Sequence, residues 1–215
     1  MKRQSCAGVN GFKFLPETGM QVFPFLRGSS QIIYRGCPFY TILRGRNIAM
    51  SQKICILTKD VAERKMSRMA LEIAEQLSGD PTPLVLIGIR ENGMVIAEMI
   101  SRLLKPYLDT EIRIVACSIN KVSAAEVTYE GNMDFNNVNV IVVDDVINSG
   151  RTLLYALKPL LETFPRRIQI LSLVERMHTS FPIKTDFVGL SVATTLLDHI
   201  QVEVQDGAVQ GAYLV

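Results

Sequence analysis

The sequence lacks tryptophan and contains only two histidines and four cysteines in 215 residues. The cysteines form no CxxC pair and have no metal-ligand spacing, so we expect reduced thiols rather than a zinc site. Two histidines are too few for a histidine-based metal centre. No apolar run reaches the length of a membrane-spanning helix, and no secretory signal is recognisable. These absences predict a cytoplasmic protein with no membrane partner.

Acidic residues are scarce in the first 49 residues, which hold seven Lys/Arg and one acid, Glu17. The remaining residues hold 16 basic and 20 acidic side chains, so the two parts differ in charge as well as in pattern. Residues 1–49 show no sustained period of 2 or 3.6, and they carry scattered glycine and proline. We therefore expect a basic, poorly ordered extension at 1–49 and one folded domain at 50–215.

Three interpretations of the extension remain open. A basic arm that contacts nucleic acid or membrane is one, and a transit peptide is another. The favoured interpretation is that translation starts at Met50, because an organised pattern begins there at once.

The most informative stretch runs from residue 138 to 154. A continuous apolar run at 140–143 predicts a strand that is buried on both faces of a parallel sheet. Asp144 and Asp145 follow where that strand should end, and then come a short polar turn and leucines at helical spacing. Backbone N–H groups at a helix start bind anions, and Ser149 and Thr152 add hydroxyl donors. The stretch therefore predicts a phosphate site.

A plain strand–turn–helix connection is the alternative interpretation of this stretch. The paired aspartates argue against it, because two like charges at a buried strand end repel each other unless a cation or hydroxyl groups offset them.

A second unit of the same kind begins with an apolar strand at 84–87. A loop from Gly88 to Gly93 follows it, and then a helix with apolar residues from Val95 to Leu104. Arg90 is either a solvated turn residue or part of a second anion site, in which the glycines allow close approach of the backbone. Both loops would face one crevice at the carboxyl edge of the sheet.

The remaining pattern predicts a helix from about 58–60 to 77, further strands at 111–119, 168–174 and 200–204, and a mobile segment at 120–131. Alternating strands and helices indicate an α/β fold, a doubly wound parallel sheet flanked by helices, with a small C-terminal hood region.

The stretch Val-Ile-Val-Val-Asp-Asp-Val-Ile-Asn-Ser-Gly-Arg-Thr resembles the phosphoribosyl-pyrophosphate (PRPP) loop of type I phosphoribosyltransferases. Over residues 53–215 the chain most resembles the group of pyrimidine operon regulators with uracil phosphoribosyltransferase activity. The long block at 174–189 carries this resemblance beside the loop.

The resemblance implies a transferase that uses PRPP, a nucleobase and Mg²⁺, and that forms a homodimer or higher homo-oligomer. It implies the following roles. Catalysis would involve Asp144, Asp145 and Lys121, with the two aspartates holding Mg²⁺ through water. The PRPP 5′-phosphate would lie on Asn148, Ser149, Gly150, Arg151 and Thr152. The pyrophosphate would lie on Gly88, Arg90, Gly93 and Arg176. The base would contact Phe187 and Val188.

Two departures from these relatives bear on activity, and one difference from purine-using members bears on the substrate. The relatives carry an arginine at the position of Asn92. They carry Arg-Asp-Asp where this chain has Lys121-Val122-Ser123, and this difference leaves the level of activity open. Asn148 stands where purine-using members place an aspartate that accepts a proton, and an amide cannot do so. We therefore expect uracil as the base, with purine transfer as an alternative.

A regulator that senses nucleotide and binds RNA, with weak or no catalysis, is the other alternative. It is less favoured, because the net negative charge of residues 50–215 argues against a strong basic face.

Overall fold

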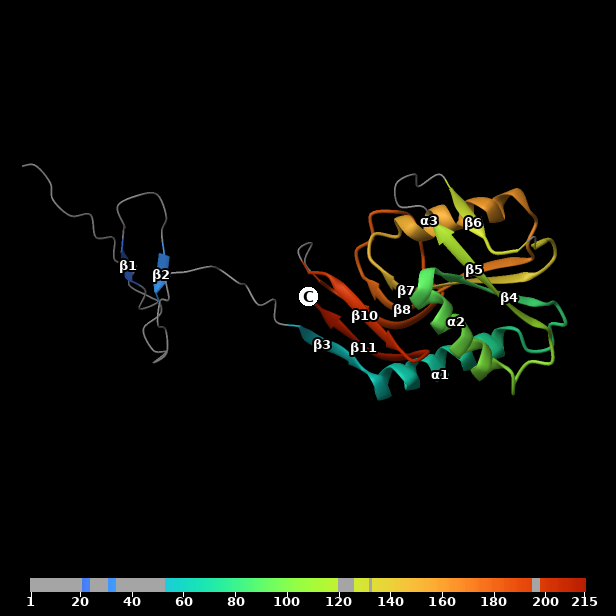
Figure 1. Ribbon diagram of the computed structural model, residues 1–215, viewed down its shortest axis with the longest axis horizontal. Coiled ribbons are helices and arrows are strands. Elements are labelled where there is room, and N and C mark those ends of the chain that lie inside the picture. Colours follow the sequence, from blue (N-terminus) through green and yellow to red (C-terminus); the bar gives the residue numbers. More distant parts are fainter. Residues whose placement is uncertain (1–20, 24–30, 34–52, 120–125, 132, 195–197) are drawn as a thin grey trace, which may run out of the picture. The chain divides into compact units, whose positions relative to one another are not determined.

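A computed structural model describes residues 21–23, 31–33, 53–119, 126–131, 133–194 and 198–215 (Figure 1). The chain divides into two units, Met1–Ala49 and Met50–Val215. In the first, β1 (Gln21–Phe23) and β2 (Gln31–Ile33) form an antiparallel pair. All that follows concerns the second unit.

The second unit is built on a six-stranded sheet with the order β6-β5-β4-β7-β8-β9. Strands β5, β4, β7, β8 and β9 run parallel, and the edge strand β6 pairs antiparallel with β5. The crossover order confirms the predicted doubly wound α/β fold. The strand bounds are β4 Leu84–Ile89, β5 Ile112–Ile119, β6 Val127–Tyr129, β7 Asn139–Ile147, β8 Arg167–Arg176 and β9 Phe187–Val192.

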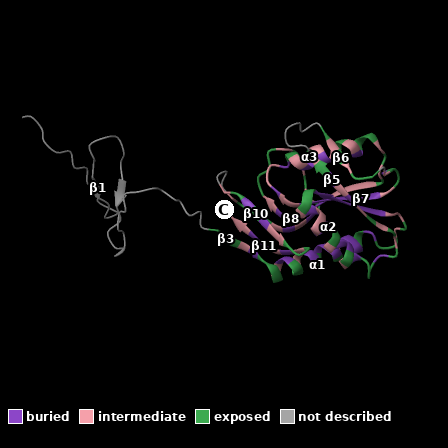
Figure 2. Cartoon of the chain, viewed as in Figure 1, coloured by how far each residue is buried: buried purple, intermediate pink, exposed green. Residues whose placement is uncertain are grey.

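Helices cover both faces of this sheet. Leu84 and Leu86 of β4 belong to the core under α1 (Lys59–Gln76) and α2 (Arg90–Leu104). Val85 and Ile87 of the same strand belong to a second core, under α3 (Arg151–Leu157) and the 3₁₀ helix η1 (Lys158–Glu162). Successive side chains of a strand point to opposite faces, so a continuous apolar run serves both cores. Figure 2 shows the inner strand β7 coloured as buried.

A three-stranded antiparallel sheet with the order β10-β11-β3 forms the hood. Its strands are β3 (Ile54–Thr58), β10 (Ile200–Gln205) and β11 (Ala208–Leu214), which joins the start of the domain to its end (Figure 1). The two strands from the C-terminal end meet at Asp206 and Gly207, both with positive φ, which is the backbone of a tight hairpin.

The structure differs from the sequence-based expectation at the start of α2. We expected a loop from Gly88 to Gly93, but β4 continues to Ile89 and the helix begins at Arg90. Gly88 therefore lies in a strand and Gly93 in a helix. No helix in the described part of the chain is long and apolar enough to cross a membrane.

Candidate active site

A pocket of about 300 Å³ opens where the carboxyl end of β7 meets the start of α2 and the hood strand β10. A second, more open hollow adjoins it and shares Arg90, Asn92 and Asp145 with it. In a parallel sheet the carboxyl ends of the strands form the usual ligand crevice. The first pocket is lined by Arg90, Asn92, Asp144, Asp145, Val146, Ile147, Asn148, Ser149, Gly150, Thr152, Leu153, His199, Ile200, Gln201 and Val202.

The paired aspartates lie at the floor of this pocket. Asp144 is only 7% exposed, and its Oδ1 accepts the backbone N–H of Asp145 at 3.0 Å. Asp145 is half-buried; its Oδ1 accepts the N–H of Val146 at 2.9 Å and its Oδ2 accepts an N–H of the Asn92 amide at 2.8 Å. Both carboxylates are thus oriented by hydrogen bonds before any ligand arrives.

Burial raises the pKa of Asp144 well above its ordinary value, and the neighbouring charge of Asp145 raises it further. The Arg90 guanidinium acts in the opposite direction but is a smaller influence. A carboxylate pair held under such strain is typical of a site where a cation or hydroxyl groups of a ligand offset the charge.

The polar turn after β7 forms a second wall. Gly150 has a φ of +81°, and a Cβ on it would lie 3.3 Å from the Ile183 Cβ, so the turn requires glycine. The carbonyl of Ser149 accepts the N–H groups of Ser180 and Phe181 at 3.1 and 3.0 Å, which ties the turn to the segment after β8. The Arg151 guanidinium lies about 5.8 Å from the Phe181 ring, and Arg151 is not among the pocket-lining residues.

Asn148 has an unmet hydrogen-bonding requirement in this wall. Its Oδ1 is buried and accepts no hydrogen bond from the residues that the structure describes. A buried acceptor of this kind needs a donor, and a phosphate oxygen cannot supply one. An N–H or O–H donor, from a ligand or from a water molecule, would satisfy Asn148 Oδ1.

The glycines at the start of α2 act through packing. A Cβ on Gly93 would lie 2.7 Å from the Val143 carbonyl oxygen, and one on Gly88 would lie 2.7 Å from the Met94 Cα. Neither glycine lines the pocket. Their missing side chains let the first turn of α2 lie directly on β4 and β7, which carries Arg90 to the pocket. Arg90 itself has a φ of +56°, a backbone strain that is common at functional sites.

The hood forms another wall of the pocket, which the sequence did not predict. His199, Ile200, Gln201 and Val202 reach the pocket from β10 and the residue before it. Arg176, expected at the pyrophosphate, does not line the pocket; its guanidinium donates to the carbonyl of Asp198, beside this wall. Only the alternating apolar pattern of β10 was visible in the sequence, and that pattern indicates a strand without indicating what it faces.

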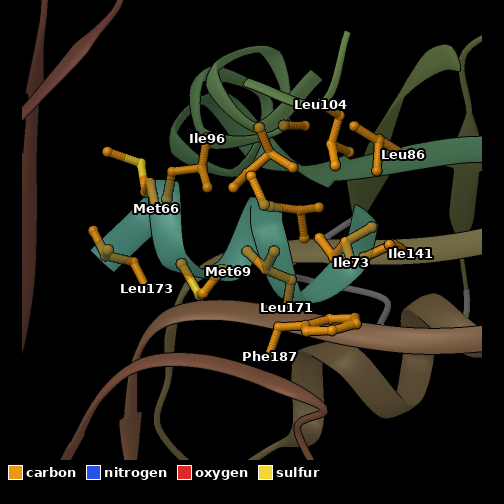
Figure 3. Packing of buried hydrophobic residues seen from close by; sticks show 14 of the residues in the cluster. Met66, Met69, Ile73, Leu86, Ile96, Leu104, Ile141, Leu171, Leu173 and Phe187 are labelled. Atoms are coloured by element: carbon orange, nitrogen blue, oxygen red, sulfur yellow. The ribbon is translucent and has the colours of Figure 1, made fainter. Parts of the chain in front are cut away.

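Phe187 was expected to stack on the base, but the structure has its ring in the hydrophobic core. The ring is 1% exposed and packs in the core beside Leu171, beneath the α1 residues Met69 and Ile73 (Figure 3). The carbonyl of Val188 accepts a hydrogen bond from Arg68 of α1, and neither residue of the expected base contact lines the pocket. An apolar residue at the start of a strand can face either the core or a ligand, and the Phe187 side chain faces the core. Lys121 lies outside the described residues.

Cys117, whose pKa is influenced by Asp144, is poorly suited to act as a nucleophile. Burial raises the pKa of the Cys117 thiol to about 12, and the charge of Asp144 adds to the rise. The thiolate, which is the nucleophilic form, is therefore rare at neutral pH.

The donor set fits a magnesium ion that arrives with a phosphorylated ligand. Within the described ranges no group of three or more His, Cys, Asp or Glu side chains could hold a metal ion unaided. Mg²⁺ in such sites takes one or two carboxylates and completes its shell with water and phosphate oxygens. Asp144 and Asp145 supply that share, and their mutual repulsion is what a cation would offset.

Comparison with known proteins identifies the relatives of this chain. The model of the phosphoribosyl transferase domain family matches residues 56–206. A "Bifunctional protein PyrR" of Macrococcus caseolyticus is 32% identical over 159 residues, which covers 70% of this chain and 91% of the relative. Its counterpart in Actinobacillus pleuropneumoniae is 34% identical over 161 residues, which covers 70% and 89%.

Solved structures with the same fold include phosphoribosyltransferases that act on purines. The hypoxanthine phosphoribosyltransferase of Trypanosoma cruzi superposes with a TM-score of 0.64 at 14% identity, covering 78% of this chain and 96% of that one. A hypoxanthine-guanine phosphoribosyltransferase of Bacillus anthracis gives 0.54 at 20% identity, covering 66% and 83%. The superpositions establish a shared fold. At such low sequence identity they carry no information about which base this chain uses.

Proposed function

Because this chain belongs to the phosphoribosyltransferase family, with the PyrR proteins among its relatives, we propose that it transfers the phosphoribosyl group of PRPP to uracil, giving uridine monophosphate and pyrophosphate. One observation supports the proposal most directly. Asp144, Asp145 and residues of the segment 148–152 line one pocket, and Arg90 lies beside the two aspartates.

The ribose would lie over the aspartates. Their carboxylates would accept hydrogen bonds from the ribose hydroxyls, which would partly offset the repulsion between the two negative charges. As the bond from C1 to pyrophosphate breaks, positive charge builds on the sugar, and carboxylates beneath the ribose would stabilise it. The base nitrogen is the nucleophile, so the protein contributes position and electrostatics and forms no covalent intermediate.

The two ends of PRPP would occupy opposite sides of the aspartates. The 5′-phosphate would lie on the turn formed by Ser149, Gly150 and Thr152, with its backbone N–H groups and hydroxyls as donors. The pyrophosphate would lie toward Arg90 and the adjoining hollow, where the guanidinium balances the leaving group. Asp144 and Asp145 would hold magnesium through water beside the pyrophosphate, and the ion would supply positive charge that offsets the charge of the leaving group.

Asn148 supports uracil over a purine. Its amide cannot take up a proton at neutral pH, but its unpartnered Oδ1 accepts a hydrogen bond from an N–H or O–H of the bound nucleotide. Because Phe187 lies in the core, the base would instead contact Asn148 and the hood residues 199–202, which line the pocket.

A base panel tests this proposal. Purified protein with magnesium and PRPP should convert uracil with a kcat/KM at least about tenfold above that for hypoxanthine, guanine or orotate, because hydrogen-bonding sites discriminate strongly between bases. Product formation is followed by chromatography and mass spectrometry. Faster conversion of a purine would favour the purine alternative, and PRPP binding without turnover of any base would refute the enzyme proposal in favour of a nucleotide-sensing protein.

A further inference from the structure

The Asn92 side chain joins two parts of the pocket that the chain brings from far apart. One amide hydrogen bond runs to Asp145 Oδ2 at 2.8 Å, and another to the carbonyl of Val202 at 3.3 Å. The first partner lies in the central strand β7, and the second lies in the hood strand β10. We propose that Asn92 is a positioning residue that orients the Asp145 carboxylate and fixes the hood wall to it. The catalytic half of this inference rests on the proposed role of Asp145.

Rigid backbone contacts hold the amide in place. Gly93, the next residue, lies so close to β7 that a Cβ would approach the Val143 carbonyl oxygen to 2.7 Å. The first turn of α2 is therefore packed directly against the sheet. Arg90, at the start of this turn, has a φ of +56°. Asn92 is half-buried, and its short side chain has few rotamers that satisfy both hydrogen bonds.

The hydrogen bond to Asp145 sets the plane of the carboxylate. Oδ1 already accepts the N–H of Val146 at 2.9 Å, so the Asn92 amide at Oδ2 supplies the second fixed point. A carboxylate held at both oxygens cannot rotate freely, yet each oxygen keeps a lone pair for a ligand hydroxyl. This is the arrangement of a supporting residue behind a catalytic group.

The hydrogen bond to Val202 joins the same amide to the hood. Val202 lines the pocket beside Ile200 and Gln201, so its position determines the shape of the wall that faces the ligand. Because one amide group donates to both partners, a displaced hood would also loosen Asp145. The sequence difference at Asn92 therefore has a direct geometric consequence: a neutral, two-donor side chain bridges the carboxylate and the hood here.

Two substitutions separate hydrogen bonding from space filling. Asn92→Ala removes the amide, whereas Asn92→Leu keeps the branching at Cγ but has no donor. In substrate-free protein, amide hydrogen exchange in residues 200–205 should become about tenfold faster in both variants, the effect of one lost hydrogen-bonded link. In the transferase assay kcat should fall about tenfold, while KM for PRPP changes less, because misorientation weakens the transition state more than ground-state binding.

Gln169→Ala is the matched control. The Gln169 amide also joins two elements, by a hydrogen bond to Gln76 at 2.8 Å, but it lies on an exposed surface and does not line the pocket. It should leave exchange in β10 and kcat at wild-type values.

Wild-type exchange in β10 for both Asn92 variants would overturn the proposal, as would full activity in Asn92→Leu. A wild-type protein without transferase activity would refute the proposed function, whereas faster exchange in β10 of the variants would still support the link between Asp145 and the hood.

Discussion

The double variant Asp144→Asn/Asp145→Asn is expected to bind PRPP at least about 100-fold more weakly than the wild type, and to lose measurable transfer. In the proposed site each carboxylate would offer charged acceptors to the ribose hydroxyls, and a hydrogen bond to a charged group contributes more than one to a neutral amide. The substitution also removes the negative charges that would lie near a bound magnesium ion. Isothermal titration calorimetry with PRPP and magnesium measures the affinity directly. Asp109→Asn, an exposed aspartate outside the pocket, is the control that should bind normally.

The single variant Asp144→Asn should show that the two adjacent aspartates lower the free energy of unfolding. Burial, and then the charge of Asp145, raise the pKa of Asp144 in the folded protein above its unfolded value. The folded state therefore holds this proton more tightly, and stability falls as pH rises through the unfolded pKa toward the folded one. Asp144→Asn should thus be more stable than the wild type at pH 7, by roughly 1 kcal/mol.

Urea unfolding at two pH values checks that sign. Below about pH 4, where the carboxyl is protonated in both states, the advantage of the amide should shrink. A loss of stability at pH 7 in Asp144→Asn, or unchanged PRPP affinity in the double variant, would contradict the assignment of the pair as a strained ligand site.

Gly93→Ala is expected to lower both stability and activity. The new Cβ would lie 2.7 Å from a backbone oxygen of β7, which cannot move as a flexible side chain can. Overpacking of this kind costs about 2 kcal/mol. The first turn of α2 must shift with it, and that turn carries Arg90 and Asn92. A displacement near 1 Å in a catalytic site costs on the order of 100-fold in rate, so kcat/KM should fall by about that factor.

Gly79→Ala separates backbone strain from displacement of the site. Gly79 has a φ of +74° and open space around it, so alanine there should cost about 1 kcal/mol of stability without loss of activity. Urea unfolding and steady-state kinetics of both variants make the comparison. Gly93→Ala with wild-type kinetics would show that the start of α2 tolerates movement and does not position the pocket.

Local patterns in the sequence predicted the central sheet well. The apolar runs at 84–87 and 140–143 lie in β4 and β7, because a strand buried on both faces needs no partner information to be recognised. The turn at 148–150 and the start of α3 follow β7 as expected, since these residues are adjacent in the chain.

Long-range contacts limited the prediction of the site. Nothing local indicates that Val202 meets Asn92 across 110 residues, or that the hood wall closes the pocket. Phe187 shows the same limit, because an apolar residue does not reveal whether it faces the core or a ligand. Gly93 was interpreted as a loop glycine, whereas its role depends on how close a helix comes to a strand.

The most direct test of the proposed site is a crystal structure of the protein with PRPP and magnesium. The 5′-phosphate should lie on Ser149, Gly150 and Thr152, the ribose hydroxyls on Asp144 and Asp145, and the pyrophosphate toward Arg90. Density for PRPP in any other place, or in the reverse orientation across the aspartates, would contradict the account.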